Sequence, residues 1–200
     1  ESPGLWAAAE ALAKLGYVEV VAPREQQTSM GRSYPQQHDA RVHPQTLKIH
    51  GQDWTVYGVG GSPAQAVVYG MLEHNKEIDL VVSGINFGEN LGASITASGT
   101  VGAALEAACA GIPALAVSLE TDPAHHFDLT DDTDFQAAAY FTQLFAAKML
   151  KHKMPHDVDM LKIDVPADAT PNTEWLLTRL SRIAYYYPTL EKPEEPGGEL

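Results

Sequence analysis

The sequence predicts an α/β protein with a doubly wound, mainly parallel sheet that carries helices on both faces. Short apolar runs without polar alternation, at residues 79–82 and 114–119, are typical of strands buried on both sides. Segments with helical spacing of apolar residues separate such runs along the chain. Because parallel strands need long crossover connections, this alternation predicts a sheet covered by helices.

The individual elements follow from periodicity and from helix start and stop signals. In the first half of the chain we expect a helix at 5–15, a strand at 17–23, a broken polar loop at 24–44, a hairpin at 47–59 and a helix from Ser62 to Leu72. In the second half we expect strands at 79–82, 114–119, 159–166 and 178–187, and helices at 101–110 and 135–150. Ser62 followed by proline is a typical helix start, because serine caps and proline fits the first turn.

Composition narrows the class of protein. The chain of 200 residues has 44% hydrophobic residues, which predicts one folded domain over residues 1–187 and a polar, Pro/Gly-rich segment over residues 188–200. A net charge of −13 argues against a nucleic-acid polymer as partner, because such binding needs a basic surface. We see no signal peptide and no apolar run long enough for a membrane span, so we expect a cytoplasmic protein without membrane contact.

The strongest functional signal lies between the strand at 79–82 and the helix at 101–110. Asn86 and Asn90 offer amide groups that can ligate a hard cation or hold a phosphate. Ser98, Gly99 and Thr100 open the following helix, where free N–H groups and the helix dipole favour an anion. The alternative is an ordinary loop in which asparagine forms turns and serine caps the helix.

A second polar stretch, PREQQTSMGRS from Pro23, follows the strand at 17–23 in the same way. Thr28 and Ser29 supply hydroxyl groups there. Because ligands bind at the carboxyl ends of strands in open α/β sheets, the two stretches can converge on one crevice. The alternative is a solvated loop.

These motifs together resemble the SurE family of metal-dependent nucleotide phosphatases, the survival protein E family. The matching stretches are SGINFGENLG, SGTVGAALEA, GIPALAVSL, VVAPREQQTSMGRS, VGGSPAQAV and LKIDVP. They extend over nearly the whole chain. The resemblance implies a Rossmann-like fold and hydrolysis of the phosphomonoester of nucleoside 5′- and 3′-monophosphates with a divalent metal, Mg²⁺ or Mn²⁺. It also implies a homodimer or homotetramer of the full-length protein.

The resemblance also assigns residues to roles. The family holds its metal with two adjacent aspartates after its first strand, a hydroxyl residue and the asparagine of its Ser-Gly-Ile-Asn motif. By position the asparagine is Asn86 and the hydroxyl residue is Thr28, with Ser29 as a neighbouring competitor. Asn90 and the segment Ser98, Gly99 and Thr100 correspond to phosphate-binding positions.

One departure from the family pattern is severe. The paired aspartates and the strand before them are not in this sequence, so no catalytic residue is assigned here. We expect them to precede Glu1 in a longer protein, and we expect weak or no activity from these 200 residues alone. The alternative is a non-catalytic nucleotide-binding Rossmann-like domain that has lost its acidic metal pair.

Overall fold

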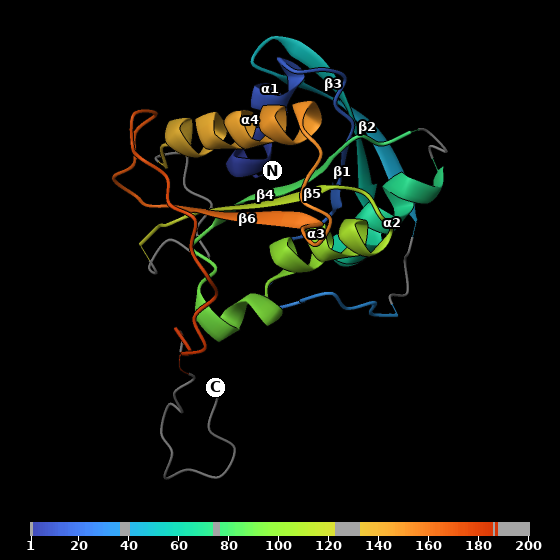
Figure 1. The fold of residues 1–200 in the computed structure, drawn as a ribbon. Helices are drawn as coiled ribbons and strands as arrows, with labels where there is room; N and C mark the ends of the chain where they lie inside the picture. Colours follow the sequence, from blue (N-terminus) through green and yellow to red (C-terminus); the bar gives the residue numbers. More distant parts are fainter. Residues whose placement is uncertain (1, 37–40, 74–76, 123–132, 186, 188–200) are drawn as a thin grey trace.

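The computed structural model describes residues 2–36, 41–73, 77–122, 133–185 and 187 (Figure 1). Its helices are α1 (Pro3–Ala13), α2 (Pro63–Glu73), α3 (Gly99–Cys109), α4 (Gln136–Lys151) and the short 3-10 helix η1 (Gly92–Thr96). Its strands are β1 (Val20–Pro23), β2 (Val42–Ile49), β3 (Gln52–Val59), β4 (Val81–Phe87), β5 (Ala114–Leu119) and β6 (Met160–Val165). The predicted segment 188–200 lies outside the described residues.

The strands form two small sheets. In one of them β4, β5 and β6 run parallel in that order, and every residue of the central strand β5 is buried. In the other the order is β1, β3, β2, with β1 parallel to β3 and β2 joined to β3 as an antiparallel hairpin. The apolar run of β5 therefore occupies the position that its lack of polar alternation predicts.

Helices cover both faces of the strands, with α1 and α4 on one face and α2 and α3 on the other (Figure 1). The helix α1 contacts both α4 and β4, and its Trp6 packs edge-on against Trp54 of β3 at a ring distance of 5.9 Å. On the opposite face α2 contacts β1, while α3 contacts β4 and β5. The predicted α/β, Rossmann-like class with a mainly parallel sheet is confirmed.

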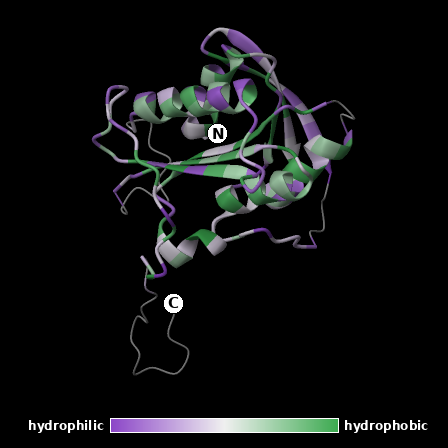
Figure 2. Cartoon of the chain, in the orientation of Figure 1, coloured by the Kyte–Doolittle hydropathy of each residue, from purple (hydrophilic) through white to green (hydrophobic). Residues whose placement is uncertain are grey.

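The hydrophobic core lies around the sheet of β4, β5 and β6. Figure 2 shows apolar residues along these strands and more hydrophilic ones along the β2–β3 hairpin. The largest cluster of buried residues joins β5 to α4 through Leu115, Val117, Phe135 and Phe141. Among the described residues, no helix combines the length and apolar character that crossing a membrane requires.

Two sequence-based expectations about elements were wrong. The segment 24–44 is not a loop to its end, because β2 begins at Val42 and includes Pro44. Proline is tolerated there because β2 is an edge strand, where a missing N–H costs no ladder bond. The described residues from 178 to 185 form no strand, and most of them are exposed. Aromatic and β-branched residues favour a strand but do not form one without pairing to a neighbouring strand.

Candidate functional site

A cavity of about 910 Å³ separates the two sheets at the outer edges of β1 and β4. It is lined by both strands, the loop after each of them, and the start of α3. All of the predicted site residues line it: Thr28, Asn86, Asn90, Ser98, Gly99 and Thr100, together with the competitor Ser29. The two loops therefore open into one cavity, as the positions of the strand ends predicted.

Asn86 lies in β4 itself, one residue before the strand ends, although the sequence placed it in a loop. The pairing of β4 with β5 shifts between Ser83 and Asn86. Gly84 permits this irregularity, because it has a φ of 122° and because a Cβ there would lie 2.3 Å from the Val117 carbonyl oxygen. The irregular backbone turns the end of β4 into the cavity.

The orientation of the Asn86 amide is fixed by three hydrogen bonds. Its Nδ2 donates to the carbonyl oxygens of Phe87 and Gly88, both at 2.8 Å. Its Oδ1 accepts from the Thr100 hydroxyl at 3.2 Å. Since both donors of the amide are used within its own loop, the oxygen is the group left to face a ligand, and a second lone pair remains on it.

The start of α3 contributes donors to the same cavity. Ser98 caps the helix, with its Oγ accepting from the Val101 N–H at 3.2 Å. Ser98 therefore caps α3, which is the alternative that the sequence offered for this residue. The N–H groups of Gly99 and Thr100 follow in the first turn, where no carbonyl of the helix can accept them. They form the part of this segment that suits an anion.

The loop after β1 is held against α3. The Gly31 N–H donates to the Ala97 carbonyl oxygen at 2.8 Å, and a Cβ on Gly102 would lie 2.1 Å from the Gly31 carbonyl oxygen. Arg32 forms an ion pair with Glu106, with Nε 2.5 Å from Oε2. Residues 28 and 29 are positioned at the cavity by these contacts a few residues further along.

The ionisable groups around the Arg32–Glu106 ion pair shift one another's pKa values. Burial would raise the pKa of the Glu106 carboxyl, but hydrogen bonds from Arg32 and Tyr34 outweigh burial and lower it below the ordinary value. Burial raises the pKa of Tyr34 to about 12, with a further contribution from its hydrogen bond to Glu106. The hydrogen bonds from Arg32 and Tyr34 therefore favour the ionised form of the Glu106 carboxyl.

The choice between Thr28 and Ser29 as a ligand stays a prediction. Both line the cavity. Ser29 has a φ of 55°, which side-chain-bearing residues seldom adopt, so the chain reverses sharply at the site. Such backbone conformations concentrate at functional sites.

Asn90 is held by hydrogen bonds to residues of β5 and β6. Its N–H donates to Asp164 Oδ1 at 3.0 Å, and its Nδ2 donates to Ser118 Oγ at 2.8 Å. One side-chain hydrogen is therefore used within the protein, and one remains for a phosphate oxygen. Sequence reasoning missed the residues that hold Asn90. The sequence shows Lys162 and Asp164 in a strand pattern, but only the fold brings Asp164 beside Asn90.

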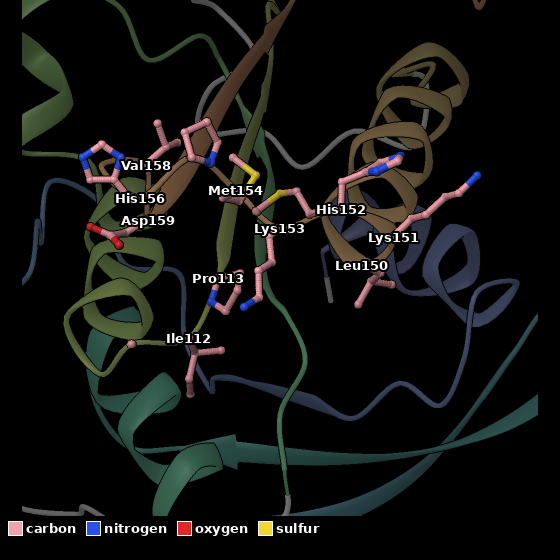
Figure 3. Close-up of a pocket in the computed structure, with 13 residues that line it drawn as sticks. Ile112, Pro113, Leu150, Lys151, His152, Lys153, Met154, His156, Val158 and Asp159 are labelled. Atoms are coloured by element: carbon pink, nitrogen blue, oxygen red, sulfur yellow. The ribbon is translucent and has the colours of Figure 1, made fainter.

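A second, smaller cavity of about 430 Å³ lies at the opposite end of β5 and β6 (Figure 3). Lys151, His152, Lys153 and His156 line it, and Lys153 extends toward Pro113 while Lys151 points away (Figure 3). Of these residues Lys151 lies in the last turn of α4, where a positive charge offsets the negative end of the helix dipole. None of the predicted site residues line this cavity.

Comparison with known proteins identifies the family. The family model described as survival protein SurE matches residues 1–186. The chain belongs to the SurE family. It is 41% identical over 197 residues to the 5′-nucleotidase SurE of Thermococcus gammatolerans, covering 98% of this chain and 72% of that protein. It is 43% identical over 199 residues to the 5′-nucleotidase SurE of Archaeoglobus fulgidus, covering 98% and 74%.

A solved structure of a SurE protein supports the fold. The SurE protein from Aquifex aeolicus matches with a TM-score of 0.64 and 34% sequence identity. The match covers 83% of this chain and 62% of the Aquifex chain, so this chain spans less than two thirds of that protein.

Proposed function

We propose that this SurE protein is a metal-dependent 5′-nucleotidase that releases phosphate from nucleoside monophosphates in the cavity between β1 and β4. The observation that carries the proposal is the convergence of Asn86 and Thr100 with the start of α3 and the hydroxyls of residues 28 and 29. The two relatives named 5′-nucleotidase SurE support the reaction class.

The donors in the cavity fit part of a coordination sphere for a hard divalent cation. The Asn86 Oδ1, directed by its hydrogen bonds, and the hydroxyl of Thr28 are neutral oxygen ligands of the kind that Mg²⁺ and Mn²⁺ accept. Within the part of the chain that the structure describes, no three acidic, histidine or cysteine side chains are grouped to hold a metal. The proposal therefore needs carboxylates from another segment.

The outer edges of β1 and β4 offer a place for that segment. Each strand has neighbours on one side only within the described chain, and the cavity lies between the two edges. Ser2, which comes directly before α1, also lines the cavity. We propose that a parallel strand occupies this gap and carries the two adjacent aspartates of the family at its carboxyl end.

The roles of this chain's own residues follow from their donors. The N–H groups of Gly99 and Thr100 would stabilise charge on the phosphoryl oxygens at the positive end of α3. The Thr100 hydroxyl orients the Asn86 oxygen, and the amide hydrogen of Asn90 that Ser118 does not accept would donate to a phosphate oxygen. A bound metal would polarise the phosphoryl group and activate a water. One of the aspartates would serve as base or nucleophile.

We extend the proposal to 3′-monophosphates as substrates and to Mg²⁺ or Mn²⁺ as the metal. Both isomers carry the same phosphomonoester group, so the N–H groups at the start of α3 suit either one. We propose a homodimer or homotetramer for the full-length protein and a cytoplasmic location.

A phosphate-release assay on the full-length protein tests the proposal. Nucleoside 5′- and 3′-monophosphates should be hydrolysed with Mg²⁺ or Mn²⁺, and EDTA should abolish the activity. Replacing Thr100 with Val should lower kcat/KM by about tenfold while unfolding stays nearly unchanged, because a hydroxyl is lost with little volume. Binding of nucleotides without any phosphate release would instead support a non-catalytic nucleotide-binding domain.

A further inference from the structure

Charged side chains lie beside the candidate site, on the side away from β1. We call Glu89, Lys162 and Asp164 the charge cluster. Glu89 is buried with an exposed fraction of 8%, and the side chains of Lys162 and Asp164 are 18% and 26% exposed. Glu89 comes from the loop after β4, whereas the other two come from β6. Such groups are costly to bury unless they compensate one another.

Asp164 uses both of its carboxylate oxygens. Its Oδ1 accepts the Asn90 N–H at 3.0 Å, and its Oδ2 forms an ion pair with Lys162. Ser118, which lies opposite Asp164 in the β5–β6 register, accepts from the Asn90 side chain at 2.8 Å. The backbone and the side chain of Asn90 are thus both held from neighbouring strands.

Lys162 is the cation of the charge cluster and faces two carboxylates, those of Glu89 and Asp164. Burial lowers the pKa of Lys162 to about 8, against the opposing field of Glu89. Apolar residues of similar size are often as stabilising as a buried ion pair, so stability alone does not account for the arrangement. What an apolar pair could not supply is an acceptor fixed in place for the Asn90 N–H.

The chain beyond β6 contacts the same loop. A hydrogen bond with Glu89 raises the pKa of Tyr185. The Ala93 N–H donates to the Ile183 carbonyl oxygen at 3.2 Å, and a Cβ on Gly92 would lie 2.2 Å from that oxygen. The loop of residues 88–91 is therefore confined by β6 and by this later segment.

We propose that Asp164, with Lys162 as its counterion, is a positioning residue of the nucleotidase site. It fixes the backbone of Asn90, so that the loop of residues 88–91 keeps the geometry that receives the substrate phosphate. This inference rests on the proposed function. Asp164 and Lys162 do not line the cavity, so they act through Asn90 and not on the substrate.

Two substitutions of Asp164 in the full-length protein test the inference. Asp164→Ala removes the acceptor, whereas Asp164→Asn keeps an oxygen acceptor but loses the charge. We expect Asp164→Ala to raise KM for a nucleoside 5′-monophosphate by about tenfold with little change in kcat, in the range found for outer-shell partners. Asp164→Asn should stay within about threefold of the wild-type KM, although the thermal midpoint falls in both variants.

Hydrogen exchange gives a readout independent of activity. The Asn90 amide should lose protection in Asp164→Ala and keep it in Asp164→Asn. Equal KM values for the two variants, or unchanged Asn90 protection in Asp164→Ala, would overturn the inference. Should Asp164→Ala fail to fold, Lys162→Gln replaces it. Lys162→Gln leaves the Asp164 carboxylate without its ion-pair partner, which should raise KM by about threefold or more. An unchanged KM would contradict the inference. A wild-type protein that releases no phosphate would contradict the proposed function instead.

Discussion

The two loops that meet at the candidate site are held in different ways. The loop after β1, residues 24–33, is anchored on α3 by a backbone contact at Gly31 and by an ion pair in which the Arg32 side chain is 46% exposed and the Glu106 side chain 11% exposed. The loop after β4, residues 88–91, is anchored by the charge cluster, in which Glu89 is buried and the side chains of Lys162 and Asp164 are 18% and 26% exposed. The cation of the first pair is open to water, which screens it, whereas the cation of the second is largely buried, so that removing it leaves carboxylates uncompensated. The difference predicts which contacts tolerate substitution.

The largest effect on stability is expected at Lys162. Lys162→Met would leave the carboxylates of Glu89 and Asp164 buried without their counterion, and should lower the free energy of unfolding by about 3 kcal/mol. Lys148→Met on the exposed surface of α4 is the matched control and should change it by less than about 0.5 kcal/mol. Denaturant unfolding measures both. Equal effects would mean that the charge cluster is not compensated as the geometry indicates.

The close contact at Gly102 should come next. Gly102→Ala would place a Cβ 2.1 Å from the Gly31 carbonyl oxygen, which should cost about 1–3 kcal/mol and displace the loop of residues 24–33. Phosphate release should fall with it. In α2, a Cβ on Gly70 would lie 3.5 Å from Val21 Cγ2, an ordinary contact. Gly70→Ala should therefore stabilise by about 0.5–1 kcal/mol, as alanine does in helices. Stabilisation by both substitutions would show that the loop does not pack on α3.

The smallest effect is expected at the ion pair of Arg32 with Glu106, and it depends on pH. Because the folded pKa of Glu106 lies below its ordinary value of 4.5, its carboxylate stabilises the fold above that value, and the contribution is lost as pH falls through the folded pKa. The wild type should exceed Glu106→Gln in stability at pH 7, and the gap should close on acidification. Thermal unfolding from pH 7 to pH 3 measures it. A gap that widens on acidification would reverse the assignment.

The sequence predicted the strands and helices that form the site better than the side-chain contacts that hold them in place. Buried runs and helix caps located β4, β5 and α3, and the rule for strand ends correctly brought Thr28 and Asn86 to one cavity. The ion pair of Arg32 with Glu106 joins residues that are 74 positions apart, and no local pattern reports such a contact. Asp164 was missed for a related reason. Its alternation with Lys162 resembles an ordinary half-exposed strand until the third neighbour, Asn90, is known.

The central claim is that the cavity between β1 and β4 holds a metal that hydrolysis requires, with Asn86 as one ligand. Metal titration of phosphate release, on the full-length wild type and Asn86→Ala, tests it most directly. Removing a neutral oxygen ligand should raise the Mg²⁺ or Mn²⁺ concentration for half-maximal activity by about tenfold or more, while the thermal midpoint of the metal-free protein reports separately the loss of the three hydrogen bonds of Asn86. An unchanged metal requirement in an active Asn86→Ala protein would contradict the claim and place the metal elsewhere.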